Sequence, residues 1–278
     1  MLAIALCLGA VCGVGVHTGG ALASNGLNAS SSPSPAPLTR FGFSDGKGGD
    51  QIIPPSQQNQ TLAAMQSVIP SGGYVRSEIH WNPYTMSEPD WTRYDAYLDR
   101  VRAHNLTWIP LIVTAIQNQR VTPQSSAGGL SAWSAAVAQI VAHYGPGGIY
   151  ALSHPGFPGL MSYVIWEEPD TPSGCAVASP PSTCQMNPVT LDQIVTSASQ
   201  AIRSQAQLMG FQPEVIGGSL GSIDLGYLTK LYNVDPSFLL NLDTVSVHMY
   251  QSVSPSTCTT TSWPPAAHCI RSLALLRA

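Results

Sequence analysis

The order of apolar and amphipathic segments predicts an α/β fold, a (β/α)8 TIM barrel that is incomplete, with about six β/α units present. Strand-like and helix-like segments alternate from Leu38 onward, and parallel strands require such crossovers. No Gly-x-Gly-x-x-Gly follows the first strand, which argues against a doubly wound sheet. Polar or aromatic residues instead follow several strands: Asp45, Arg76, His80, Trp81, Gln117, Glu167, Glu168, His248 and Tyr250. A barrel gathers its strand ends into one ring, whereas an open sheet concentrates its ligands at one switch point.

The expected strands are short and rich in β-branched or aromatic residues. In chain order they cover Phe41–Phe43, Tyr74–Ile79, Thr107–Val113, Ser162–Trp166, Glu214–Gly217 and Thr244–Tyr250. Between them, helices are expected near Thr61–Val68, Pro89–Ala103, Leu130–Tyr144, Thr190–Met209 and Leu225–Tyr232. The second helix places Trp91, Tyr94, Leu98 and Val101 on one face.

Helix boundaries are also suggested by the sequence. Thr190 is a plausible N-cap for the fourth helix, and Gly210 is expected to end it, because glycine adopts the left-handed conformation that often follows a helix. The tryptophans Trp91, Trp108 and Trp133 lie in helical or strand runs, so we expect them in the core.

Composition limits the classes of function. The chain has 278 residues, 44% hydrophobic and 9% charged, which is enough for one large core. The net charge is −4, with 11 basic residues and no basic run. Nucleic-acid binding therefore has little support.

The N-terminal segment has the pattern of a secretory signal peptide. Leu2–Val16 is almost wholly apolar, and Ala21-Leu22-Ala23 is a small-residue cleavage pattern. We therefore expect a signal peptide over 1–23, a Ser/Pro-rich linker over 24–37 and the barrel domain over 38–278, in a secreted protein without stable membrane insertion. The alternative is an N-terminal membrane anchor, for which the apolar run is short.

Four of the six cysteines form two close pairs outside the signal segment, Cys175 with Cys184 and Cys258 with Cys269. Each pair brackets a loop rich in Pro, Ser and Thr. An even number of cysteines with short loops in a secreted chain favours local disulfides, although the sequence does not fix the pairing. A zinc site is the rival, but the required C-x2-4-C spacing is absent.

The most informative stretch is Tyr163–Asp170, where a buried-strand pattern ends in two carboxylates and a proline. Its Trp166-Glu167-Glu168-Pro169 resembles the Trp-Asn-Glu-Pro signature that ends the fourth strand in retaining glycoside hydrolases with (β/α)8 barrels, cellulase-like and xylosidase-like. The resemblance implies that Glu168 is the general acid/base. The alternative is a carboxylate paired to an arginine at the barrel rim.

Glu167 stands where the family has Asn, which hydrogen-bonds the sugar 2-hydroxyl. A glutamate can accept that bond, and its charge favours protonation of the neighbouring carboxyl. The departure from the family pattern leaves a structural role for Glu167 open.

Arg76 lies in the second strand, where the family places an arginine that orients the nucleophile; an ordinary salt bridge, for example to Glu78, is the alternative.

Two more features extend the resemblance. His248 and Tyr250 form the His-x-Tyr of the sixth strand, whose side chains line the family's site; a buried histidine and a core tyrosine are the alternative. Trp81 is expected after the second strand, in a loop, as a sugar-stacking residue, although a single aromatic is more often packing.

No acidic residue follows Asp243 in this sequence. The family's nucleophile, a Glu ending the seventh strand, is thus expected to be absent from this chain, which predicts an incomplete copy of the barrel. The predicted function is a secreted O-glycosyl hydrolase acting on a polysaccharide or oligosaccharide, without a cofactor. The alternatives are a non-catalytic or degenerate carbohydrate-binding barrel and an inverting hydrolase that uses Glu167, Glu168 or Asp45.

Overall fold

The computed structural model describes residues 42–46, 53–69, 72–85, 89–116, 119–125, 128–172, 174–175, 184–221 and 224–247. Several expectations lie outside these residues, namely the signal peptide (1–23), the linker (24–37), His248, Tyr250, Cys258 and Cys269.

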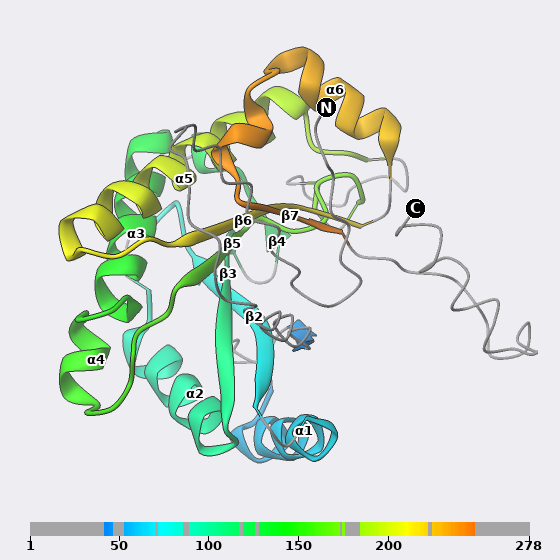
Figure 1. Cartoon of the computed structure of the whole chain (residues 1–278). Helices are drawn as coiled ribbons and strands as arrows, with labels where there is room; N and C mark the ends of the chain where they lie inside the picture. The colour runs from blue at the N-terminus through cyan, green and yellow to red at the C-terminus, as the bar shows by residue number, and fades with distance from the viewer. Residues whose placement is uncertain are drawn as a thin grey trace, which may run out of the picture.

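Strands and helices alternate along the described part of the chain (Figure 1). The strands are β1 (Gly42–Gly46), β2 (Gly73–Trp81), β3 (Leu106–Ile116), β4 (Gln119–Arg120), β5 (Ser162–Ile165), β6 (Glu214–Leu220) and β7 (Thr244–Val247). The helices are α1 (Pro55–Val68), α2 (Trp91–Ala103), α3 (Gly129–Tyr144), α4 (Ile149–Ser153), α5 (Pro188–Met209) and α6 (Leu225–Val234), with 3-10 turns η1 (Pro123–Ser125) and η2 (Phe238–Asn241).

The sheet runs in sequential order, β1-β2-β3-β5-β6-β7, and every neighbouring pair on this path is parallel. Strand β4 adds a short antiparallel pair to the end of β3. Since crossovers between parallel strands share one hand, a sequential order places all the helices on one face of the sheet. The α/β fold with parallel strands alternating with helices is thus confirmed, in the arrangement of part of a (β/α)8 barrel.

The two faces of the sheet carry different cores. Outward residues such as Trp108 and Ile112 of β3 join the large cluster with buried residues of all six helices. A small second cluster lies inside the curve of the sheet. It consists of the inward residues of β3 (Ile109, Leu111 and Val113) together with Val164 of β5 and Ile216 of β6. A strand buried on both faces reads as a continuous apolar run, which is why β3 could be recognised in the sequence.

Most predicted elements are present, with differences at their ends. The N-cap of α5 is Asn187, whose side chain accepts from the Val189 N–H, and not Thr190, because Pro188 starts the helix earlier. Gly210 ends α5 in the left-handed conformation (φ 77°), as predicted. Strand β1 runs to Gly46, so Asp45 lies within the strand and not after it.

Four short elements had no counterpart in the sequence interpretation: strand β4, helix α4 and the turns η1 and η2. Helix α4 has 5 residues, and β4 and η1 are shorter still. Such lengths show no hydrophobic periodicity, so the sequence pattern could not reveal them. Among the described residues, no helix has the length and apolar character needed to cross a membrane.

Candidate active site

Arg76, in the first half of β2, and Glu167, just after β5, meet inside the curve of the sheet. Arg76 Nη2 donates to Glu167 Oε1 at 2.5 Å and to Ser44 Oγ at 3.0 Å. The side chains of Arg76 and Glu167 are only 15% and 12% exposed, so this is a largely desolvated ion pair. Of the alternatives for Arg76, the salt bridge is therefore present, with Glu167 as its partner and not Glu78.

A second nitrogen of the Arg76 guanidinium is also buried. This nitrogen, Nη1, has no hydrogen-bond partner among the described residues. A buried donor of a permanently charged group is costly when it is unpaired. The arrangement therefore favours an oxygen acceptor beside Arg76 that the described residues do not supply.

Glu78 and His80 share the inward face of β2 with Arg76, because alternate residues of a strand point the same way. A hydrogen bond joins His80 Nε2 and Glu78 Oε2, and the two side chains are 15% and 8% exposed. His80 was expected in a loop. It lies in the strand because β2 continues to Trp81, paired with β3 along its whole length.

The side chain of Trp81 points to the outward face of β2, opposite to Arg76, Glu78 and His80. The expectation that Trp81 stacks on a sugar is therefore wrong. It is 2% exposed in the large core and packs against Trp133, with ring centroids 6.0 Å apart and planes at 41°. Its ring faces are covered, so they cannot stack on a sugar. Trp108 and Trp133 are buried as expected, and Trp91 stacks on His143 at 4.3 Å against the core.

The residues that follow β5 have unusual backbone dihedral angles. Trp166 and Glu168 both have positive φ, 62° and 49°, in a region that side-chain-bearing residues rarely adopt. Trp166 is fully buried and its Nε1 donates to Gly174 O at 3.3 Å. The Glu168 N–H donates to Ser219 O at 2.7 Å, and Glu168 itself is half-buried. Such conformations persist only where the surroundings enforce them, and they concentrate at functional sites.

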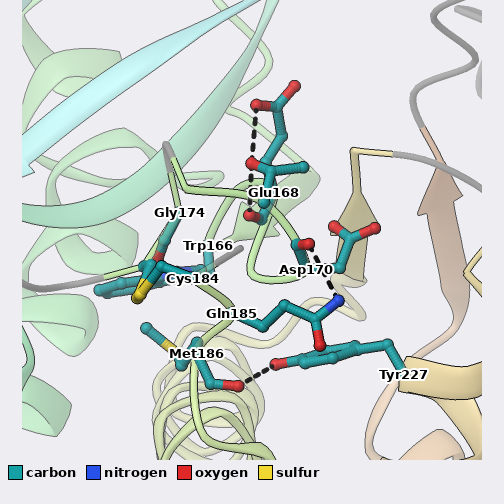
Figure 2. Close-up of a disulfide and its surroundings, with 10 residues drawn as sticks. Trp166, Glu168, Asp170, Gly174, Cys184, Gln185, Met186 and Tyr227 are labelled. Atoms are coloured by element: carbon teal, nitrogen blue, oxygen red, sulfur yellow. Dashed lines mark hydrogen bonds between the residues drawn. A yellow bond between two sulfur atoms is a disulfide. The ribbon is translucent and has the colours of Figure 1, made fainter. Parts of the chain in front are cut away.

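A disulfide closes the loop that follows Glu168 (Figure 2). Cys175 is bonded to Cys184, which confirms that predicted pair. The Met186 N–H donates to Pro169 O at 2.7 Å, so the two ends of the loop are tied together. Gly174 lies so close to Glu168 that an added Cβ would be 2.0 Å from the Glu168 carbonyl oxygen. The loop is thus packed directly against the backbone of Glu168.

The site residues predicted from sequence divide into three groups. Arg76, Glu167 and Glu168 lie at the same end of the sheet; Trp81 does not face it; His248 and Tyr250 lie outside the described residues. Two participants were missed, Ser44 and Asp170. A lone serine in a strand carries no signal, whereas the position of Asp170 directly after the Trp166–Pro169 motif is a signal in the sequence.

No group of three or more His, Cys, Asp or Glu side chains among the described residues could hold a metal ion. The chemistry available at the carboxyl ends of β1, β2 and β5 is that of carboxylates, one guanidinium and one imidazole. Such groups can transfer protons and bind hydroxyl groups.

Comparison with known proteins yields structural likeness at low sequence identity. No protein-family model matches the chain, and no curated protein matches it. The catalytic domain of a GH30 xylanase C from Talaromyces cellulolyticus is similar at 13% identity and a TM-score of 0.45, over 76% of this chain and 53% of that one. A GH39 β-xylosidase from Caulobacter crescentus is similar at 14% identity and a TM-score of 0.49, over 78% and 48%.

A third structure is the GH39 enzyme from Xanthomonas axonopodis pv. citri, at 15% identity and a TM-score of 0.43, over 74% of this chain and 40% of that one. The chain thus spans 40% to 53% of the length of these structures. Likeness at this level decides nothing about activity, and the fold assignment stands on the strand order itself.

Proposed function

We propose that this chain carries the general acid/base of a secreted retaining glycoside hydrolase, and that Glu168 is that residue. The observation that carries the proposal is the placement of Glu168 directly after a parallel strand, in a left-handed backbone held by Ser219 and beside the Arg76–Glu167 pair. Catalytic groups of barrel enzymes stand at this end of the strands.

In the proposed reaction, the Glu168 carboxyl donates its proton to the glycosidic oxygen as the sugar–oxygen bond breaks. A nucleophilic carboxylate forms the glycosyl–enzyme bond, and Glu168 then removes a proton from the water that hydrolyses it. The described residues suggest no free nucleophile, since Glu78 is hydrogen-bonded to His80 and Glu167 is paired with Arg76. We therefore assign the nucleophile to none of the described residues.

Glu167 and Arg76 have a binding role in this proposal. With one oxygen held by Arg76, the Glu167 carboxylate is oriented and can accept a hydrogen bond from a sugar hydroxyl. The buried Nη1 of Arg76 is a second donor for an oxygen of the sugar or of a catalytic carboxylate. The pairing also offsets the charge of Glu167 next to Glu168.

The test is Glu168→Gln in the complete product of the gene, assayed on an aryl glycoside with a good leaving group and on an oligosaccharide of the same sugar. A sugar leaving group needs protonation and a nitrophenolate does not, so we expect a loss of at least about 100-fold on the oligosaccharide. The loss on the aryl glycoside in the first, glycosylation step should be much smaller.

Glu214→Gln is the matched control. Glu214 lies at the opposite end of the sheet, where its two oxygens accept from Ser162 Oγ at 2.7 Å and Thr244 Oγ1 at 3.0 Å. It should leave the ratio of the two rates unchanged. Equal losses on both substrates in Glu168→Gln would contradict the proposal, and saturable sugar binding without any hydrolysis by the unmodified protein would favour a carbohydrate-binding barrel.

Secretion is part of the proposal and rests on the leader pattern together with the Cys175–Cys184 disulfide, since such bonds are stable in oxidising compartments. N-terminal sequencing of the exported protein tests it, with Ser24 as the expected first residue. An uncut N-terminus in the membrane fraction would instead support the anchor.

A further inference from the structure

Asp170 lies two residues after Glu168, at the start of the disulfide loop (Figure 2). It is buried and fixes this loop to the neighbouring strand. It is 7% exposed, and its Oδ1 accepts from the Gly221 N–H at 2.6 Å in a buried hydrogen bond. The Glu168 N–H donates to Ser219 O at 2.7 Å. These two hydrogen bonds lie on either side of Pro169 and join the segment after β5 to the end of β6.

A side chain is needed at this point because the main chain cannot continue the ladder. Pro169 has no N–H, and the pairing of β5 with β6 ends at Val164 and Ile216. The Asp170 carboxylate provides an acceptor for the Gly221 N–H where regular pairing has ended. It thereby satisfies a buried donor that would otherwise be costly to leave unpaired.

The same residue is tied to the start of α6. The Asp170 carbonyl accepts from Gln185 Nε2 at 3.3 Å, and Gln185 Nε2 also donates to Asp224 Oδ2 at 3.0 Å. Asp224 caps α6 by accepting from the Tyr227 N–H at 2.9 Å. Burial raises the pKa of Tyr227, and the nearby charges of Asp170 and Asp224 raise it further. Asp170 therefore sits in a network that links the loop between β5 and α5 to the loop between β6 and α6.

We propose that Asp170 is a positioning residue for the general acid: its carboxylate, bound to the Gly221 N–H, holds Glu168 in the left-handed conformation from which it protonates the leaving oxygen. This inference rests on the proposed function of Glu168. Asp170 is buried and acts through the backbone of its neighbour, without touching the sugar. Small displacements of a catalytic group cost large factors in rate, on the order of 100-fold for 1 Å.

The experiment compares Asp170→Ala and Asp170→Asn in the complete gene product, on the same aryl glycoside and oligosaccharide pair. Asp170→Ala removes the acceptor, so kcat/KM on the oligosaccharide should fall by about 100-fold and that on the aryl glycoside by less than about 10-fold. Asp170→Asn keeps an oxygen acceptor for the Gly221 N–H and should recover most of the loss. If Asp170→Ala does not fold, Asp170→Glu displaces the acceptor by one methylene and should show the same selective loss.

Asp235→Ala is the matched control, because Asp235 also accepts from a main-chain N–H, that of Ser237 at 2.8 Å, but lies exposed after α6. It should not change the ratio of the two rates. Two outcomes would overturn the positioning role: equal losses on both substrates for Asp170→Ala, or a loss in Asp170→Asn as large as that in Asp170→Ala. If Glu168→Gln still shows the selective loss on the oligosaccharide, the proposed function remains supported in either case. If Glu168→Gln is itself unselective, both proposals fail.

Discussion

The inner face of the sheet carries a glutamate network at each end, and the two differ in their partners and in their backbone. At the amino end, Glu214 accepts from two neutral hydroxyl groups, those of Ser162 and Thr244, and all three residues are the first of their strands. At the carboxyl end, Glu167 is held by the guanidinium of Arg76, and the chain around it has positive φ at Trp166 and Glu168.

The comparison distinguishes an end of the sheet whose hydrogen bonds hold strands together from an end that gathers charged groups. Neutral hydroxyl donors satisfy Glu214 and join three strands without backbone distortion. The carboxyl end concentrates a largely desolvated ion pair and strained φ values, both of which cost free energy, and a disulfide loop packs against them. In barrel enzymes, the carboxyl end of the strands carries the site and the amino end contributes to stability.

Breaking the ion pair should have the largest effect on stability. Arg76→Met keeps the aliphatic length but leaves the Glu167 carboxylate largely buried without its counter-charge, so we expect a loss of about 3 kcal/mol in the free energy of unfolding. Denaturant titration of the gene product measures it. At the other end, Glu214→Gln keeps one acceptor oxygen and should cost only about 1 kcal/mol.

The double variant Arg76→Met/Glu167→Gln sharpens that result. Once the uncompensated charge is removed, part of the lost stability should return. A loss below about 1 kcal/mol in Arg76→Met would show that the pair behaves like an exposed salt bridge, and the contrast between the two ends would then disappear.

Gly174→Ala should have a smaller effect on stability and a clear effect on rate. The new Cβ would fall 2.0 Å from the Glu168 carbonyl oxygen, so the loop and Glu168 must shift, and hydrolysis of the oligosaccharide should fall by about 100-fold. Gly210→Ala at the end of α5 is the control, since nothing lies within 4 Å of an added Cβ there. Its positive φ should cost roughly 1 kcal/mol without changing the rate.

Unchanged hydrolysis in Gly174→Ala would mean that the loop can move without displacing the acid, which would weaken the link between the loop and the site. A rate loss in Gly210→Ala comparable to that in Gly174→Ala would indicate a general loss of folded protein. Circular dichroism of both variants at the assay temperature distinguishes these cases.

The fold was largely accessible from the sequence because long elements leave regular signals. The buried strand Leu106–Ile116 and the helices Trp91–Ala103 and Pro188–Met209 were recognised by apolar runs and helical spacing, to within a few residues at their ends. The carboxylates at the end of β5 were recognised because a strand pattern stops abruptly at a proline.

The tertiary structure decided which side chains face the site. Whether Trp81 belongs to a loop or to the last position of β2 depends on how far β2 pairs with β3, and a shift of one residue exchanges the two faces. The partner of Arg76 was equally undetermined, because Glu78 and Glu167 are both plausible from the sequence. Only the curve of the sheet, which brings the inward face of β2 within reach of the residue after β5 across β3, selects Glu167. Periodicity along the chain fixes local structure, whereas pairing between distant residues depends on register and stagger, which the three-dimensional arrangement sets.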